Sequence, residues 1–214
     1  MIDSFTAGTV AFDGHRGDEI EAYLARPAGF RARAGVVVIH HRAGCDRGTK
    51  EIVRRLAELG YDAICPNLLR RGAPDERLIA DAAGATRYLL SLPTSNRKIG
   101  VIGFGSGGSQ AVLAACNIDY AAAIDCYGAF AADELPRLRA PLLGLFGSQD
   151  AYPNPAQVAE LDELLSHEDK PHEFHSYDRA GHDFFAVDQP SYSVAAANDG
   201  WGRIAAFYTD HLGG

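Results

Sequence analysis

The chain alternates short apolar runs with longer segments of helical pattern over most of its length. The run at 35–40 is continuous and rich in β-branched residues, which is typical of a strand buried on both faces of a parallel sheet. Similar runs recur at 63–66, 98–103, 121–127, 141–146 and 172–177, and helix signals cover about 49–59, 75–90, 110–116, 155–167 and 193–212. This alternation predicts an α/β fold with a mostly parallel, doubly wound sheet and helices on both faces.

The first part of the chain has a different pattern. Two short alternating runs, at 9–12 and 20–25, are separated by a polar, glycine-containing stretch and predict an antiparallel hairpin at one edge of the sheet. With 214 residues, 47% of them hydrophobic, the chain is long enough for one well-packed domain. We therefore expect a single domain over 1–214, without a separate lid domain.

Charge and cysteine usage narrow the class of partner. The formal net charge of -8 argues against a nucleic-acid-binding surface, and no stretch approaches the length of a membrane span. The four cysteines lack metal-ligand or CxxC spacing, and the start of the chain has no secretory pattern. These features predict a cytoplasmic protein that acts on a small molecule, with no metal and no cofactor, as a monomer or a homodimer.

The most informative stretch follows the run at 98–103, where an apolar strand enters a glycine-dense turn and then a helix. This is the pattern of a nucleophile elbow, Gly-x-Nu-x-Gly, which needs small residues two before and two after the nucleophile. A nucleophile at Ser106 would place bulky Phe104 two positions before it, whereas position 105 is flanked by Gly103 and Gly107. The better register therefore puts Gly105, which has no reactive side chain, at the nucleophile position.

Two further residues lie in the order that a catalytic triad requires. Asp150 and His182 each follow a predicted strand, after the elbow, and ligands of such sheets bind at the carboxyl ends of the strands. An aspartate after a strand is more often a turn residue, and a loop histidine is usually solvated. Together with the elbow, however, they predict a catalytic pair.

With these motifs, the chain resembles the dienelactone hydrolase family of α/β-hydrolases over nearly its whole length. The resemblance rests on the strand and loop at 36–44, on Gly60-Tyr61-Asp62-Ala63, Pro66-Asn67-Leu68, the elbow, Phe146-Gly147 to Asp150, Gly181-His182-Asp183-Phe184, and the last helix with Trp201. It implies a cysteine nucleophile in the elbow and an acid and a base that match Asp150 and His182. Three positions depart from the family: Gly105 replaces the cysteine, His41 replaces a glutamate that contacts the thiol, and Ala186 replaces one of two substrate-carboxylate arginines.

The other groups of the predicted site can still support catalysis. Backbone N–H groups of Ser106 and Arg42 are expected to form an oxyanion hole, because both are main-chain groups that the fold positions. His182, oriented by Asp150, is a competent general acid or base, and His41 and Arg42 can add positive charge opposite it.

Other strand-end residues are candidates for substrate binding. Arg71 matches the second family arginine and is predicted to hold an acidic or strongly polar substrate group, and Tyr127 lies in the loop after the strand at 121–127. His40 is expected only to bond backbone groups. Buried, unreactive thiols are expected at Cys45 and Cys126.

Three functions remain open from the sequence. The first is a nucleophile-free enzyme in which His182 and Asp150 act on a small carbonyl-bearing molecule, as a lyase, isomerase or cyclase or by direct activation of water. The second is an ester or lactone hydrolase that uses Ser106 as its nucleophile. The third is a catalytically silent binding module, against which the retained pair of His182 and Asp150 argues because a buried charge is costly.

Overall fold

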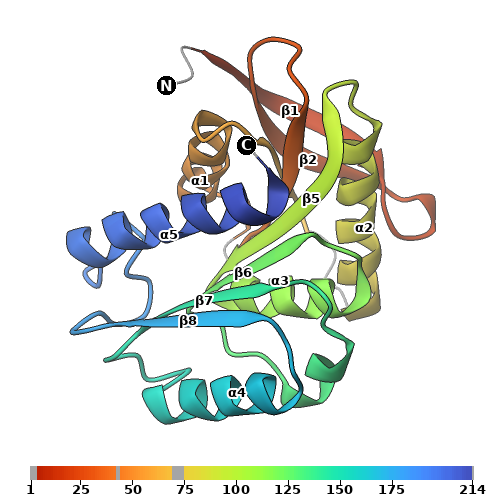
Figure 1. Ribbon diagram of the computed structural model, residues 1–214. Helices are drawn as coiled ribbons and strands as arrows, with labels where there is room; N and C mark the ends of the chain where they lie inside the picture. Colours follow the sequence, from red (N-terminus) through yellow and green to blue (C-terminus); the bar gives the residue numbers. More distant parts are fainter. Residues whose placement is uncertain (1–3, 42–43, 69–74, 214) are drawn as a thin grey trace.

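The structure is a computed structural model that describes residues 4–41, 44–68 and 75–213. The expectations for Arg42 and Arg71 lie outside the described residues. Strands of the described part form one eight-stranded sheet in the order β1-β2-β4-β3-β5-β6-β7-β8 (Figure 1). The strands are β1 (Phe5–Asp13), β2 (Glu19–Pro27), β3 (Arg33–Ile39), β4 (Asp62–Pro66), β5 (Ser95–Phe104), β6 (Ala122–Cys126), β7 (Leu142–Gly147) and β8 (His172–Tyr177).

The α/β class and the mostly parallel sheet are therefore confirmed. Strands β3 to β8 run parallel to one another, while β2 is antiparallel to both β1 and β4, so the predicted hairpin does form one edge. The helices are α1 (Arg47–Glu58), α2 (Asp75–Ser91), α3 (Ser106–Asn117), α4 (Pro155–His167) and α5 (Val194–Leu212). Two short 3-10 helices, His15–Gly17 and Ala132–Arg137, were not predicted because neither carries a helical repeat of apolar residues.

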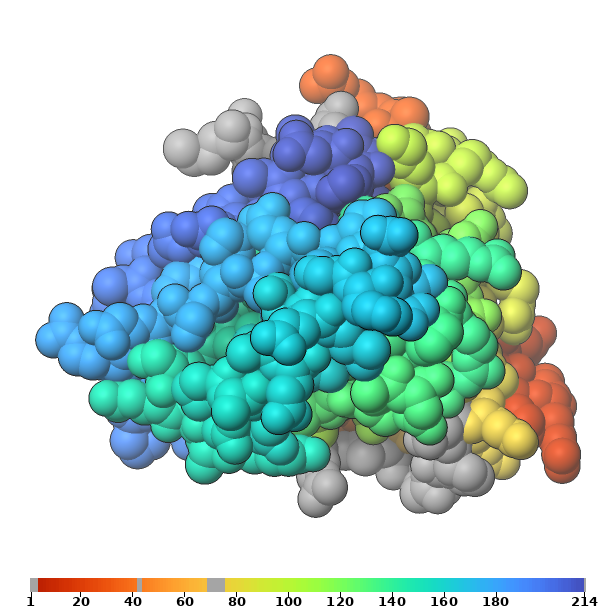
Figure 2. Space-filling view, turned by 60° about the horizontal axis from the view of Figure 1, so that its bottom comes forward, coloured from red at the N-terminus to blue at the C-terminus, as the bar shows by residue number. Residues whose placement is uncertain are grey.

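The sheet is covered on both faces, which explains why its central strands are mostly apolar. Val36 and Val38 of β3 face a core formed with α1 and α5, whereas Val37 and Ile39 face a second core formed with α2, α3 and α4. Because successive strand side chains point to opposite faces, a strand between two cores is apolar at nearly all of its positions. Figure 2 shows the side on which α4 and the segment from β8 onward lie at the surface.

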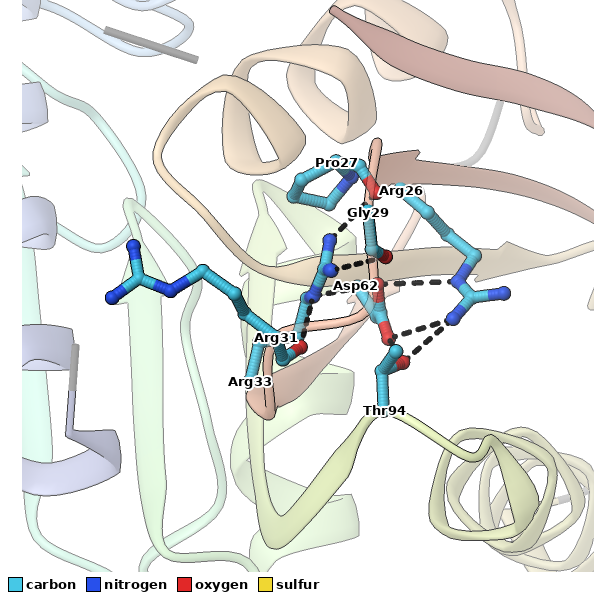
Figure 3. Close-up of polar contacts among 7 residues, drawn as sticks. All are labelled: Arg26, Pro27, Gly29, Arg31, Arg33, Asp62 and Thr94. Carbon is cyan, nitrogen blue, oxygen red and sulfur yellow. Dashed lines mark hydrogen bonds and ion pairs between the residues drawn. The ribbon is translucent and has the colours of Figure 1, made fainter.

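Polar groups at the amino ends of the parallel strands form a buried network (Figure 3). Arg26 donates to both carboxylate oxygens of Asp62, at 3.2 and 3.4 Å, and to the Thr94 hydroxyl at 2.6 Å. Thr94 in turn donates to Asp62 at 2.9 Å, and the Arg33 guanidinium donates to three backbone carbonyls while lying 3.9 Å from the same carboxylate. The network joins β2, β4 and the chain entering β5 at the end of the sheet opposite the predicted site.

Within the described ranges, no helix is both long enough and apolar enough to cross a membrane.

Candidate active site

The turn between β5 and α3 has the geometry expected of the elbow. Gly105 has φ 55° and ψ -123°, a region that residues with a side chain rarely adopt. A Cβ on Gly103 would lie 1.9 Å from the carbonyl oxygen of Gly107, and a Cβ on Gly107 would lie 2.3 Å from that of Ile39. Both flanking positions must therefore be glycine, and the strained position between them is residue 105, as the register predicted.

Phe104, the residue before the strained position, packs into the core as expected. Its side chain is buried, and its ring meets those of Phe185 and Trp201 at centroid distances of 5.5 and 6.3 Å. The ring anchors the end of β5, so that the turn at Gly105 projects from the carboxyl edge of the sheet.

Asp150 and His182 meet at this edge, as predicted. His182 Nδ1 donates to Asp150 Oδ2 at 2.7 Å, and the other carboxylate oxygen accepts the backbone N–H of Tyr152 at 3.0 Å. The Asp150 side chain is 3% exposed, whereas that of His182 is 42% exposed. With its Nδ1 proton committed to the carboxylate, a neutral His182 ring presents the lone pair of Nε2 to the site.

The Nε2 atom faces Gly105. A Cβ built on Gly105 would lie 3.3 Å from His182 Nε2 and 3.9 Å from the ring edge of Tyr127. The Tyr127 and His182 rings meet edge to face at 5.0 Å, and burial raises the pKa of Tyr127 well above its ordinary value. Tyr127 thus lines the site with its ring, which also contacts the ring of Phe185 at a centroid distance of 6.2 Å.

Asp183 is a residue of this site that the sequence reading did not single out. Its Oδ1 lies 3.9 Å from His182 Nε2 and 4.0 Å from the point that a Cβ on Gly105 would occupy. The residue has φ 59°, and its side chain is 47% exposed. The sequence signals for Asp183 were its position directly after a candidate base and its place in the segment that carries the family resemblance, but a positive φ cannot be read from a single aspartate.

Ser106 begins α3, and its backbone N–H has no acceptor in the described part of the chain. The first N–H groups of a helix lack intrahelical partners and carry the positive end of the helix dipole. This N–H is thus available to a developing negative charge beside Gly105. No hydrogen bond joins the half-buried Ser106 hydroxyl to His182 among the described residues.

The two histidines after β3 have separate environments. His40 is buried; its Nε2 accepts the Leu68 N–H at 3.0 Å and its Nδ1 donates to the His41 carbonyl at 2.7 Å. Burial lowers the pKa of His40, which favours the neutral ring. It holds two loops together, as expected. His41 is half-exposed, and its Nε2 lies 3.1 Å from a carboxylate oxygen of Asp46, the N-cap of α1.

Two cysteines near the strand ends differ in exposure. Cys126 is fully buried at the end of β6, and burial raises the pKa of its thiol well above the ordinary value. It is therefore the unreactive thiol that was expected. The expectation of a buried, unreactive thiol is wrong for Cys45, which is only partly buried and whose thiol pKa is lowered by its contact with Cys65.

A buried carboxyl group packs against the first turn of α3, next to the elbow. Asp125 on β6 accepts the Gly128 N–H at 2.8 Å through Oδ1, while its buried Oδ2 has no hydrogen-bond partner among the residues that the structure describes. Burial raises the pKa of Asp125 well above the ordinary value, which favours the protonated acid. A Cβ on Gly108 would lie 1.9 Å from Asp125 Oδ1, so α3 can approach β6 this closely only with glycine there.

Among the described residues, no group of three or more histidine, cysteine or acidic side chains is arranged to hold a metal ion.

Comparison with known proteins identifies the family to which the chain belongs. The profile of the dienelactone hydrolase family matches residues 20–212. The chain belongs to the dienelactone hydrolase family. It is an enzyme with the α/β-hydrolase fold, of a family that acts on small molecules.

Individual members of the dienelactone hydrolase family and of this fold extend the comparison. The carboxymethylenebutenolidase of Pseudomonas putida is 30% identical over an alignment of 220 positions, which covers 87% of this chain and 88% of that protein. A Klebsiella pneumoniae structure named "Putative Dienelactone Hydrolase" has a TM-score of 0.92 and 26% identity, with 97% and 99% of the two chains covered. The dienelactone hydrolase-like promiscuous phosphotriesterase P91, from metagenomic libraries, shares the fold with a TM-score of 0.86 at 19% identity, with 98% and 100% of the chains covered.

Proposed function

We propose that this member of the dienelactone hydrolase family acts on a small carbonyl-bearing molecule by acid–base chemistry of His182 and Asp150, without a covalent intermediate. The observation that carries the proposal is the position of His182 Nε2, 3.3 Å from the Cβ position of a residue that has no side chain. A base in this place has no enzyme nucleophile to deprotonate, so its proton partner is water or the substrate itself.

Hydrolysis of an ester or lactone by these groups would proceed in the following steps. Water attacks the carbonyl carbon of an ester or lactone while one of its protons passes to His182 Nε2. The Ser106 N–H stabilises the negative charge on the former carbonyl oxygen, and the buried Asp150 carboxylate stabilises the imidazolium. The carbon–oxygen bond then breaks, and the departing alkoxide takes the proton back from His182. The acid and the alcohol that result account for all the atoms of substrate and water.

The same groups support reactions that are not hydrolytic. A base that faces an oxyanion donor can remove a proton next to a carbonyl and stabilise the enolate that forms. Elimination, isomerisation and ring closure all begin with this step, and none of them needs a nucleophile at position 105. The family favours hydrolysis, and the glycine is compatible with both classes.

The leading alternative is a hydrolase in which Ser106 is the nucleophile. Ser106 lies next to the elbow position and is half-buried, but it begins the helix and does not occupy the positive-φ residue. The backbone N–H of Ser106 is the group that would stabilise the oxyanion. An alanine at this position would supply the same N–H. The remaining alternative is a binding module without turnover.

Rates of matched variants separate these functions. We would measure hydrolysis of p-nitrophenyl acetate and of a small enol lactone, together with deuterium exchange next to the carbonyl of a small ketone in D2O. The proposal expects His182→Ala to lower the active rate by about 10²-fold or more, Asp150→Asn to lower it as well, and Ser106→Ala to keep most of it. Equal losses in His182→Ala and Ser106→Ala would identify a serine hydrolase, and a wild-type rate that His182→Ala retains would contradict catalysis by this pair.

A further inference from the structure

Asp183 places a second carboxylate beside the catalytic histidine, on the side away from Asp150. Asp150 contacts Nδ1 of the ring, whereas Oδ1 of Asp183 lies 3.9 Å from Nε2, the atom that faces the substrate side. The same oxygen lies 4.0 Å from the Cβ position of Gly105. His182 Nε2, Asp183 and Gly105 therefore surround the volume that a nucleophilic side chain would fill.

The separation of the two polar atoms is informative. At 3.9 Å, Asp183 Oδ1 and His182 Nε2 are too far apart for a direct hydrogen bond. One water at about 2.8 Å from each atom would span the gap with an angle near 90° at its oxygen, an ordinary geometry for a bridging water. The glycine leaves the volume open, and the half-exposed side chains of His182 and Asp183 leave a path from solvent.

The hydrogen-bonding groups on both sides of this volume match a water molecule. Neutral His182 offers an acceptor at Nε2, and the ionised carboxylate of Asp183 offers only acceptors, so the occupant must donate two hydrogen bonds. Water donates two and still has lone pairs to direct at an electrophile. A serine or cysteine side chain at position 105 would donate only one.

We propose that Asp183 is a second catalytic carboxylate, which holds the attacking water together with His182 in the place of the missing nucleophile. This inference rests on the proposed function and narrows it to hydrolysis by direct attack of water. One O–H of the water donates to His182 Nε2, which takes that proton as the oxygen attacks the carbonyl carbon. The other O–H donates to Asp183, keeps its proton throughout and becomes the hydroxyl of the acid product, so Asp183 fixes the direction of attack without being consumed.

The ordinary explanation of Asp183 is a turn residue, because aspartate tolerates positive φ better than most residues. Its backbone carbonyl accepts the Ala186 N–H at 2.8 Å, as in a turn. The chain offers a matched control in Asp169, which has φ 50° and an exposed side chain in the turn after α4. If the backbone alone mattered, the two aspartates would respond alike to substitution.

The test uses Asp183→Asn, which keeps the shape, and Asp183→Gly, which removes the carboxylate and relaxes the positive φ. Asp169→Asn and Asp169→Gly serve as controls. We expect both Asp183 variants to lower kcat for p-nitrophenyl acetate by about tenfold or more, with KM and Tm near the wild-type values and no change in the Asp169 variants. A crystal structure of the wild type is expected to show a water in contact with both Nε2 and Oδ1, and that of Asp183→Gly to lack it with the His182–Asp150 bond intact.

The outcomes distinguish the failure of this inference from that of the proposed function. If His182→Ala loses activity but both Asp183 variants keep the wild-type kcat, Asp183 is only a turn residue and the inference is overturned. If the Asp183 variants lose kcat in proportion to a fall in Tm, the role is structural, and the inference is again overturned. If His182→Ala itself keeps the activity, the proposed function fails first, and the role of Asp183 fails with it.

Discussion

His182 Nε2 lies 3.3 Å from the point that a Cβ atom on Gly105 would occupy. This is closer than almost all real contacts of a Cβ atom, so any side chain at position 105 would require the ring to give way by a few tenths of an ångström. The imidazole thus lies next to the elbow, where a side chain at position 105 would meet it. We therefore expect a nucleophile introduced at this position to need a small shift of the histidine ring.

Gly105→Cys tests how far the dienelactone hydrolase scaffold persists around this glycine. The introduced thiol would face His182, which can deprotonate it, so we expect an acyl-thiol adduct after incubation with p-nitrophenyl acetate. We also expect a lower Tm, because a side chain at positive φ costs about 1–2 kcal/mol. Intact-mass spectrometry and thermal unfolding measure the two effects.

Gly29→Cys is the matched control. Gly29 also has a positive φ, of 92°, and a Cβ there meets nothing within 4 Å. Gly29→Cys should therefore show the lower Tm that comes from a side chain at positive φ, but its thiol has no contact with a histidine. Acylation of both variants at the same rate would contradict the idea that His182 activates a group at position 105.

Asp125→Asn is expected to stabilise the protein at neutral and alkaline pH. Burial raises the pKa of Asp125 in the folded state, so between the ordinary aspartate range near pH 4 and the raised value the folded state binds more protons than the unfolded state. The contribution of this carboxyl to stability therefore falls as pH rises through that window, and asparagine removes the dependence. The Tm advantage of the variant should grow from pH 5 to pH 8.

The exposed Asp133 gives the control for a simple loss of charge. Asp133→Asn should change Tm by a small amount that depends little on pH. A Tm advantage of Asp125→Asn that is the same at pH 5 and pH 8, or a wild type that is more stable at pH 8, would contradict a carboxyl that is held protonated.

The network at the amino ends of the strands should matter for stability and not for catalysis. Asp62→Ala leaves the arginines Arg26 and Arg33 without their carboxylate in a buried setting, and removal of one partner from such a group typically costs about 3–5 kcal/mol. Urea unfolding should show a loss of this order, with the rate per folded molecule unchanged. Glu51→Ala, which breaks the exposed pair with Arg54, should cost well under 1 kcal/mol.

Much of this architecture could be predicted because local chemistry and the fold agree. The apolar strands between two cores, the capped helices and the glycines at 103 and 107 each permit few alternatives, so the sheet, the elbow register and the His182–Asp150 contact followed from the pattern. The predicted helix at 155–167 begins after Asn154, whose side chain caps it, and coincides with α4. The alternation of strands and helices then fixed which loops share the carboxyl edge.

The residues that were missed depend on packing between segments distant in sequence. Asp183 reaches the site because its backbone adopts a positive φ, and Asp125 is a buried acid only because glycine at 108 lets α3 approach β6. Tyr127 was placed at the site, but burial of its hydroxyl depends on the Phe184–Phe185 segment folding over it. An aspartate or a tyrosine in a loop carries no local signal for such environments.

The central claim is that turnover involves no covalent bond to the enzyme, and trapping tests it most directly. Wild-type protein would be mixed with excess p-nitrophenyl acetate, quenched in acid during turnover, and examined by intact-mass and peptide mass spectrometry. The account predicts full turnover with no acyl group on Ser106, and the same result for Ser106→Ala at a rate near that of the wild type. An acyl group on Ser106 that forms and decays at the rate of turnover, and that is lost together with activity in Ser106→Ala, would contradict it.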